Sequence, residues 1–285
     1  MTSLSADKIK ELEQKANDIR QSIIEMLTEA KSGHTAGALG MTDIFTLFYF
    51  HILKHKPKEP FWEERDRVIL SNGHICPVLY ATMAHSGYFS IEELKTLRKF
   101  GSRLQGHPHR EFLSFVETSS GPLGSGLSQA IGMALADKID GFTRGERSRT
   151  IYCFISDGEL DEGNSWEAIM LAGKNKLNKL ITIIDRNNIQ IDGNTENIMP
   201  LEPLAEKWKA FGWNVIEVSG HDFRALNEAV EESQKIKNKP SVIIAYTIPG
   251  KGVKEFERDY KWHGISPNKE QAEMAIKELQ NHRPI

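Results

Sequence analysis

The sequence Ile155-Ser-Asp-Gly-Glu-Leu-Asp-Glu-Gly163, together with the later sequence Asp185-Arg-Asn-Asn-Ile189, indicates the fold of this 285-residue chain. Each stretch lies at the end of a short run of apolar, β-branched residues, and a helical spacing of apolar residues separates the two. The order strand, loop, helix, strand predicts a βαβ unit. Because loops at the carboxyl ends of parallel strands share one edge of the sheet, we expect Asp157 and Asn187 to meet there.

The polar residues at these strand ends have the chemistry of a metal–phosphate site. Carboxylate and amide oxygens beside a glycine suit a Mg²⁺ or Ca²⁺ ion and the phosphates that it bridges. Taken alone, Glu159, Asp161 and Glu162 would be an acidic helix start, which the helix dipole favours. Two adjacent amides, Asn187-Asn188, after a buried strand are costly unless they are satisfied. The pairing therefore favours the metal–phosphate interpretation over a structural one.

The rest of the chain continues the alternation of strands and helices. Further strands are expected at residues 67–70, 214–218 and 242–245. Helices are expected from an N-cap at Ser5 to near Gly33, at residues 43–53, 91–100, 127–139, 166–177, 204–211 and 223–236, and after Ser266-Pro267 as N-cap and first turn. This pattern predicts an α/β fold with a parallel sheet covered by helices on both faces, in one domain spanning residues 1–285.

Composition disfavours several functional classes. A net charge of −3 gives no footprint for nucleic acid or an anionic membrane. No apolar run is long enough to cross a bilayer, and the N-terminus lacks the apolar core of a signal peptide. The two cysteines, Cys76 and Cys153, suggest neither a disulfide framework nor a cysteine-based zinc site. We expect a cytoplasmic protein.

Histidines in turns are the second signal. Four histidines that adjoin a glycine outside the helical stretches predict one polar cavity reached by several loops; they are His34, His74, His107 and His263. Hydrogen bonding to phosphate and sugar hydroxyls, with proton transfer at one or two positions, is the preferred interpretation. Zinc binding is the alternative, since His107-Pro-His109 offers two imidazoles, but the helical pattern H-E-x-x-H is absent.

A glycine-rich turn, residues 121–126, precedes an expected helix. The run Gly124-Ser-Gly126-Leu-Ser-Gln129 lacks the third small residue of a dinucleotide fingerprint, so dinucleotide binding is disfavoured. A turn that brings its backbone close to some other ligand is preferred.

In this order the motifs resemble the N-terminal half of transketolase. Ser156-Asp-Gly158 and Asn187-Asn188 are similar to the thiamine diphosphate signature, G-D-G followed about thirty positions later by N-N, with serine in place of the first glycine. The collinear matches extend over residues 10–280; they include Ser32-Gly-His-Thr35, Leu70-Ser-Asn-Gly-His74, Gly101-Ser-Arg-Leu-Gln-Gly-His-Pro108, Gly121-Pro-Leu-Gly124, Glu162-Gly163, Ile189-Gln-Ile-Asp-Gly193 and His263-Gly264. Ala36-Gly-Ala38 and His109-Arg110 depart from the family pattern.

The resemblance implies roles for individual residues. A divalent ion, Mg²⁺ or in its place Ca²⁺ or Mn²⁺, would be held by the side chains of Asp157 and Asn187 and by the carbonyl of Ile189. Thiamine diphosphate would be contacted by His74, Gly121, Pro122, Leu123, Gly158, Glu159 and His263, with Ile191 near its thiazolium ring. The substrate would be surrounded by His34, His74, His107 and His263. Paired active sites would be linked across an interface by Glu162 and Glu167.

The resemblance also implies the reaction, the transfer of a two-carbon ketol unit from a ketose phosphate to an aldose phosphate. The chain matches the diphosphate half of such an enzyme and lacks the half that supplies the pyrimidine-activating glutamate and the sugar-phosphate contacts. We therefore expect the N-terminal subunit of a split transketolase, which forms an α2β2 heterotetramer with a separate C-terminal subunit.

Three alternatives remain open at this point. The α subunit of a 2-oxo acid dehydrogenase also carries the diphosphate half alone, although histidine-rich loops favour sugar hydroxyls. A specialised transketolase for a branched or sulfonated sugar would share all of these motifs. A non-catalytic regulatory subunit is disfavoured by the presence of Asp157, Asn187 and the four histidines.

Overall fold

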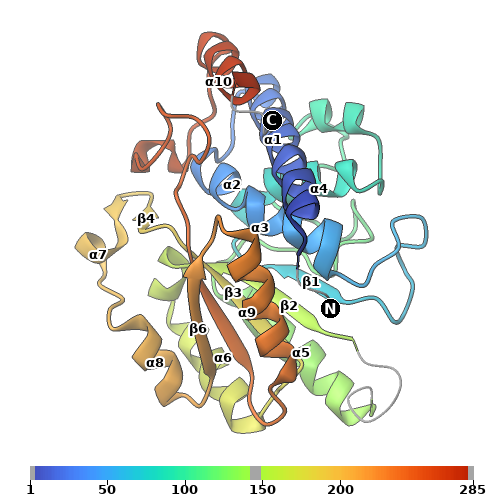
Figure 1. The fold of residues 1–285 in the computed structure, drawn as a ribbon, viewed down its shortest axis with the longest axis vertical. Coiled ribbons are helices and arrows are strands. Elements are labelled where there is room, and N and C mark those ends of the chain that lie inside the picture. Colours follow the sequence, from blue (N-terminus) through green and yellow to red (C-terminus); the bar gives the residue numbers. More distant parts are fainter. Residues whose placement is uncertain (1–3, 142–148, 282–285) are drawn as a thin grey trace.

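Five parallel strands form the centre of the computed structural model, which describes residues 4–141 and 149–281 (Figure 1). Hydrogen bonds join them in the order β1 (Arg67–Leu70), β2 (Ile151–Ser156), β3 (Leu180–Arg186), β7 (Ser241–Tyr246) and β6 (Asn214–Ser219). Every neighbouring pair is parallel. The predicted parallel α/β sheet is confirmed, and each expected strand lies within one or two residues of its observed position.

Helices cover both faces of this sheet and bury a separate apolar cluster on each face. Tyr152 and Phe154 of β2 pack on one face, where Phe154 contacts the ring of Phe45 at 4.7 Å between centroids. Ile151 and Ile155 of the same strand pack on the other. Because both faces are buried, the central strands read as continuous apolar runs in the sequence.

The helices divide between the two faces according to the same clusters. One face carries α1 (Ala6–Ala30), α3 (Thr42–Leu47), α4 (Cys76–His85) and α9 (Phe223–Lys235), and the other carries α5 (Ser125–Ile139), α6 (Gly163–Asn175) and α8 (Leu204–Ala210). The shorter elements are α2 (Ala36–Gly40), η1 (Phe48–Ile52), η2 (Gly73–Ile75), η3 (Ile91–Thr96), η4 (Gly158–Asp161), β4 (Ile189–Gln190), β5 (Gly193–Asn194), α7 (Thr195–Ile198) and η5 (Tyr260–His263). A longer helix, α10 (Lys269–Asn281), lies near the C-terminus.

The first residues of α1 and α10 can be compared with the N-caps predicted from the sequence. The hydroxyl of Ser5 accepts a hydrogen bond from the backbone N–H of Lys8 at 3.2 Å, so the predicted N-cap of α1 is confirmed. The predicted cap at Ser266 is wrong. Asn268 takes that place because its side-chain oxygen accepts from the N–H of Gln271 at 2.9 Å, while the side chain of Gln271 accepts in return from the N–H of Asn268 at 3.1 Å. This reciprocal pair is a capping box.

Two other expected helices differ in kind. The helix expected at residues 43–53 is α3 followed by a π-helical turn, η1. The helix expected at residues 91–100 is the 3₁₀ segment η3, and Arg98 beyond it has a positive φ of 60°, which an α-helix does not allow. Helix α4 is not predicted from the sequence, because it is apolar and buried on all sides and so has no amphipathic period.

The carboxyl ends of β1, β2, β3 and β7 all lie at one edge of the sheet because neighbouring strands run parallel. The loops that begin there contain most of the candidate site residues. At the far end of the chain, α10 packs on α1, where the amide of Asn17 donates to the carbonyl of Leu279 at 2.8 Å. No helix within residues 4–141 and 149–281 is long and apolar enough to cross a membrane.

Candidate active site

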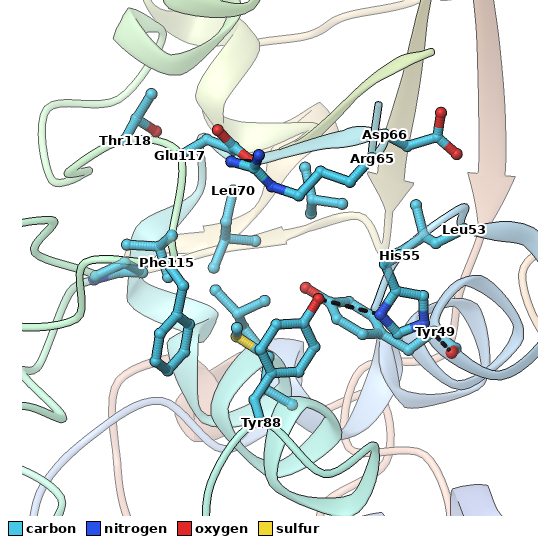
Figure 2. Close-up of a pocket in the computed structure, with 15 residues that line it drawn as sticks. Tyr49, Leu53, His55, Arg65, Asp66, Leu70, Tyr88, Phe115, Glu117 and Thr118 are labelled. Carbon is cyan, nitrogen blue, oxygen red and sulfur yellow. Dashed lines mark hydrogen bonds and ion pairs between the residues drawn. The ribbon is translucent and has the colours of Figure 1, made fainter. Parts of the chain in front are cut away.

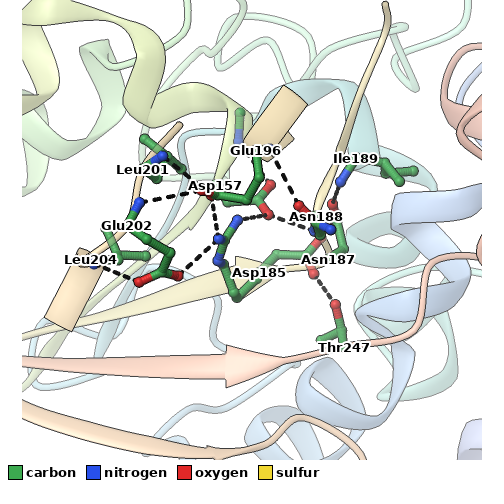
Figure 3. A network of polar contacts seen from close by, with 12 residues as sticks. Asp157, Asp185, Asn187, Asn188, Ile189, Glu196, Leu201, Glu202, Leu204 and Thr247 are labelled. Atoms are coloured by element: carbon green, nitrogen blue, oxygen red, sulfur yellow. Dashed lines mark hydrogen bonds and ion pairs between the residues drawn. The ribbon is translucent and has the colours of Figure 1, made fainter. Parts of the chain in front are cut away.

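Asp157 follows β2 and lies entirely out of solvent contact. Its Oδ1 accepts from the N–H of Gly158 at 2.8 Å, and its Oδ2 accepts from the N–H of Asn188 at 2.6 Å and from Nη1 of Arg186 at 3.0 Å (Figure 3). Burial raises the pKa of this carboxyl to about 6, although Arg186 and the two N–H groups oppose the shift. The predicted meeting of Asp157 with the Asn187-Asn188 loop is therefore observed.

Asn187 follows β3, and its amide orientation is fixed by its neighbours. Its Nδ2 donates to Oδ2 of Asp185 at 2.8 Å, and its Oδ1 accepts from the N–H of Ile189 at 2.9 Å. The hydroxyl of Thr247, at the end of β7, donates to the other oxygen of Asp185. Burial raises the pKa of Asp185 to about 7. Because Asp185 takes the amide nitrogen, the oxygen of Asn187 faces away from it with one lone pair free.

The third expected ligand is the carbonyl of Ile189 in β4. A Cβ built on Gly158 would come within 3.8 Å of this oxygen, so the carbonyl lies beside the Asp157-Gly158 turn. Two adjacent strand ends thus bring one carboxylate, one amide oxygen and one backbone carbonyl to the same edge of the sheet. Oxygen ligands of this kind fit a hard divalent cation, with phosphate oxygens completing its coordination. The residues present therefore fit the expected metal.

The zinc alternative gains no support from the structure. Across residues 4–141 and 149–281, no group of three or more histidine, cysteine, aspartate or glutamate side chains is arranged to hold a metal ion. The ring of His109 packs against that of Phe112, tilted by 52° with 4.9 Å between centroids. The metal site inferred above has a single carboxylate and is not of that type.

Glu159 is a buried carboxylate that ties three loops together, with 1% of its surface exposed. It accepts from the hydroxyl of Ser71 after β1, from the N–H of Gly124 at 2.6 Å and from the N–H of Ser156 at 3.3 Å. Burial raises its pKa to about 7 against the effect of these donors. Both oxygens are thus occupied within the protein, which favours a role in holding the loop that precedes Gly124.

The loop that contains Gly121, Pro122 and Leu123 leads into α5. Gly121 has no atom within 4 Å of where a Cβ would lie, so its backbone is open to a ligand. Gly124 has a φ of +78°, and a Cβ there would overlap the side chain of Asn164. Only glycine meets both conditions at this position, which accounts for the glycine-rich turn in the sequence.

Three of the four expected histidines form a triangle. Ring centroids are 5.0 Å apart for His34 and His74, 5.0 Å for His74 and His263, and 5.7 Å for His34 and His263. Burial lowers the pKa of each ring, that of His34 to about 4, with further depression from His263, Arg98 and His107. At neutral pH each ring is uncharged and presents one N–H donor and one nitrogen acceptor.

His107 lies beside this triangle, close to the turn before His74. A Cβ on Gly73 would overlap the hydroxyl of Ser120 and come within 3.2 Å of the His107 ring. Burial and then Arg98 lower the pKa of His107. His221 also adjoins a glycine, Gly220, but its ring instead bonds to Asp43 at 2.7 Å and accepts from the N–H of Ile248 at 2.8 Å. Adjacency to glycine alone therefore does not select the cluster.

Four of the buried polar atoms without partners lie in the same region. Neither side-chain atom of Asn72, which is fully buried, has a hydrogen-bond partner in the described part of the chain, and the same is true of the Ser120 hydroxyl and His34 Nδ1. Unsatisfied buried groups of this kind are rare unless a ligand or water completes them. Their position on the histidine loops supports a polar ligand at this edge of the sheet.

Other expected site residues are exposed. Glu162 and Glu167 lie at the start and in the first turns of α6 with their side chains in solvent. Ile191, at the tip of the β4–β5 hairpin, is 69% exposed. An isoleucine that is this exposed is suited to packing against a ligand or another chain. Pro122 is also exposed.

A small cavity lined by residues of η1, α4 and the loop around residues 115–118 is part of the scaffold (Figure 2). Its volume is about 30 Å³, enough for one or two water molecules. His55 is fixed there between the hydroxyl of Tyr88 at 3.0 Å and the carbonyl of Tyr49 at 2.8 Å, and Arg65 pairs with Glu117 at 2.8 Å. These groups satisfy one another, and the cavity is too small for a cofactor.

Several residues of the site were not found from the sequence. Asp185 and Thr247 orient Asn187, and Arg186 contacts Asp157. Arg98 extends toward two histidine loops, with Nη1 3.4 Å from the Ser32 hydroxyl and Nη2 3.5 Å from the Gly106 carbonyl. The only available signal was the position of Asp185 and Arg186 between a buried strand and the asparagine pair.

Comparison with known proteins agrees with this geometry. Residues 12–283 match the family model described as "Transketolase, thiamine diphosphate binding domain". The chain belongs to the transketolase family. The resemblance inferred from the sequence is thus confirmed, and the family places the chain among the transferases. The thiamine diphosphate-binding domain is the part of a transketolase that it contains.

Relatives of two lengths occur within the family. The chain is 41% identical to a 6-deoxy-6-sulfo-D-fructose transketolase subunit from Clostridium sp., covering 95% of this chain and 96% of that protein. It is 38% identical to an apulose-4-phosphate transketolase subunit from Phocaeicola vulgatus, covering 95% of each. Transketolase 2 of Escherichia coli is 39% identical over 94% of this chain, which spans only 41% of that longer protein.

Solved transketolase structures also match most of this chain and are themselves longer. Transketolase from Campylobacter jejuni superposes with a TM-score of 0.89 at 39% identity, covering 94% of this chain and 42% of the other. Transketolase from Leishmania mexicana gives a TM-score of 0.90 at 34% identity, covering 94% and 41%. The thiamine diphosphate-binding fold is therefore shared with transketolases that contain a further half.

Proposed function

We propose that this chain is the diphosphate-binding subunit of a two-chain transketolase, which transfers a two-carbon ketol unit from a ketose to an aldose. The observation that carries the proposal is the convergence of Asp157, Asn187 and Ile189 next to a cluster of neutral histidines. The lengths of the relatives add support, because both subunit relatives are matched almost end to end.

The chain's own residues divide the work of binding. Asp157, the amide oxygen of Asn187 and the carbonyl of Ile189 would hold the divalent ion. The diphosphate would be contacted by His74, His263, the N–H of Gly158 and the open backbone of Gly121, Pro122 and Leu123. When bound, thiamine diphosphate supplies a nucleophilic carbon and an electron sink for breaking the bond between two sugar carbons.

The histidines would act on the sugar. Because burial keeps His34, His74 and His263 uncharged at neutral pH, each ring can donate one hydrogen bond and accept another. Such rings can bind hydroxyls and carry a proton between oxygen atoms of donor and acceptor. A positioned group of this kind contributes about 10²–10⁴-fold to a rate. His107 would complete the set near the entrance.

A partner subunit would supply what this chain lacks. The exposed Ile191 would be covered by the thiazolium ring and the partner, and the exposed carboxylates of Glu162 and Glu167 would face a second copy of the site across the interface. We propose an α2β2 assembly, in which the partner provides the pyrimidine-activating glutamate and the contacts to the anionic end of the sugar. Glu159 would act on the cofactor through the loop that it holds.

Two classes of sugar are candidate substrates. The two subunit relatives are named for 6-deoxy-6-sulfo-D-fructose and for apulose 4-phosphate, which favours a specialised sugar with an anionic end. Sugar phosphates such as xylulose 5-phosphate are the second candidate, since solved relatives contain them. The family match disfavours a 2-oxo acid dehydrogenase subunit.

Reconstitution with the matching C-terminal subunit tests the proposal. The complex would be assayed with thiamine diphosphate and Mg²⁺ against both sugar classes and against 2-oxo acids. We expect an aldose product two carbons shorter than the donor, and none from this chain alone. Decarboxylation of a 2-oxo acid, or ketol transfer by the chain without a partner, would contradict it. The Asp157→Ala complex is expected to be inactive.

A further inference from the structure

Arg186 connects the expected metal loop to the segment that contains α7 and the start of α8. Its partners Asp157, Glu196 and Glu202 are labelled in Figure 3. Only 6% of its side chain is exposed, and its two terminal nitrogens face opposite partners. Within residues 4–141 and 149–281, Arg186 is the only side chain that forms an ion pair with Asp157. The role of Arg186 inferred below rests on the metal site proposed above.

The two side-chain oxygens of Asp157 accept different numbers of hydrogen bonds. Oδ2 accepts from Arg186 at 3.0 Å and from the N–H of Asn188 at 2.6 Å, whereas Oδ1 accepts only from the N–H of Gly158 at 2.8 Å. A carboxylate oxygen has two lone pairs. Oδ2 is therefore saturated, and Oδ1 keeps one lone pair for a further ligand.

The far side of Arg186 is held by two carboxylates that are more exposed than Asp157. Nη2 donates to Oε1 of Glu196 at 2.6 Å and to Oε1 of Glu202 at 3.0 Å. Each of these carboxylates in turn accepts from backbone, Glu196 from the N–H of Leu201 at 3.2 Å and Glu202 from the N–H of Leu204 at 2.8 Å. A planar guanidinium fixed at both ends has little freedom to turn.

Charge gives the arrangement a second consequence. Arg186 and its three carboxylates have a formal charge of +1 − 3 = −2, which a divalent cation would balance. Without Arg186, a carboxylate as deeply buried as Asp157 would have no opposite charge until the ion arrived.

We propose that Arg186 is a positioning residue for the metal: it saturates Oδ2 of Asp157 and so directs Oδ1 toward the ion. Groups that orient a metal ligand in this way typically change metal affinity 10–100-fold when they are removed. Glu196 and Glu202 act one step further out, by holding the guanidinium in place. Arg186 itself touches neither the substrate nor the reacting atoms.

The test measures Mn²⁺ binding by the loss of its free electron paramagnetic resonance signal, with thiamine diphosphate present and with this chain in complex with its partner subunit. We expect Arg186→Met to weaken Mn²⁺ binding about 10–100-fold, and Arg186→Lys to recover part of the loss. Arg20→Met is the matched control, because Arg20 is also buried and pairs with Asp43 at 2.7 Å, outside the metal loop. It is expected to lower stability and leave Mn²⁺ affinity unchanged.

The outcomes separate this inference from the proposal on which it rests. If the unchanged chain binds no Mn²⁺, or if Asp157→Asn binds it as well as the unchanged chain does, the metal site itself is wrong. If the site binds Mn²⁺ and Arg186→Met leaves the affinity the same, Arg186 has no positioning role. Tighter binding in Arg186→Met would show a cation that competes with the metal, and would also overturn the inference.

A second variant covers the case in which Arg186→Met does not fold. Glu196→Gln combined with Glu202→Gln removes both charges on the far side and leaves Asp157 and Arg186 in place. We expect Mn²⁺ binding about 2–10-fold weaker, below the loss for Arg186→Met because the ion pair with Asp157 remains. An unchanged affinity in this double variant would show that the guanidinium does not need its outer partners, contrary to the inference.

Discussion

Acidification is expected to destabilise the chain through its histidine cluster, with His34 as the residue that contributes most clearly. The pKa of His34 is lowered to about 4 in the folded chain, by burial first and then by His263, Arg98 and His107, from an ordinary value of 6.5. In the unfolded chain the ring is solvated and protonates near the ordinary value. Stability is therefore fully present above pH 6.5 and is lost as pH falls toward 4.

The size of this effect follows from the two pKa values. One pKa unit corresponds to about 1.36 kcal/mol, so a histidine that titrates near 6.5 when unfolded and near 4 when folded costs about 2 kcal/mol of stability at pH 5 relative to pH 7.5. His74, His107 and His263 shift in the same direction and add to the total. The contribution of His34 is isolated by replacing it.

Urea unfolding of the chain and of His34→Gln at pH 7.5 and pH 5 provides the measurement. The loss of unfolding free energy between the two pH values should be about 2 kcal/mol smaller for His34→Gln than for the unchanged chain. Equal losses in the two proteins would mean that His34 protonates freely in the folded chain, and the account of a desolvated, neutral cluster would be wrong.

Three further substitutions test the loops around the site. Glu159→Ala leaves three donors without their acceptor and should lower the free energy of unfolding by about 3–5 kcal/mol. Gly124→Ala should cost about 2 kcal/mol or more, because of its positive φ and the overlap with α6, and should weaken thiamine diphosphate binding. Its control, Gly132→Ala in an open position of α5, should stabilise by about 0.5–1 kcal/mol. Asp185→Ala frees the amide of Asn187 and should weaken Mn²⁺ binding about 10–100-fold.

Each of these has a result that would contradict it. Urea unfolding of Glu159→Ala within 1 kcal/mol of the unchanged chain, about the value of one hydrogen bond, would show that its three bonds are not needed. Equal stability changes in Gly124→Ala and Gly132→Ala would remove the case for a required glycine. Unchanged Mn²⁺ affinity in Asp185→Ala would show that Asn187 is oriented by something else.

The sequence predicts those features of the site that follow from the order and direction of the strands. Asp157 and Asn187 follow adjacent parallel strands, so their convergence is a consequence of the βαβ unit and needs no knowledge of side-chain contacts. The strands themselves are recognisable because burial on both faces requires continuous apolar runs. The histidines of the triangle could be predicted because each adjoins a glycine in a turn, although His221 shows that the same local pattern also occurs outside the site.

The part that the sequence does not predict depends on contacts between distant segments. Arg186 is one charged residue among many until the structure brings Glu196 and Glu202 to it. Glu159 resembles an acidic helix start, and its three partners lie after β1, at the end of β2 and in the loop before α5. The helix α4 has no period to detect, because all of its sides are buried.

The central claim is that this chain forms the diphosphate half of a shared thiamine site, and thiamine diphosphate binding measures it most directly. Equilibrium binding with Mg²⁺ would be measured for this chain, for its C-terminal partner and for their mixture. The account predicts tight binding only in the mixture, with one cofactor for each pair of chains and none when the mixture contains Asp157→Ala. Equally tight binding by this chain alone, or undiminished binding with Asp157→Ala, would contradict it.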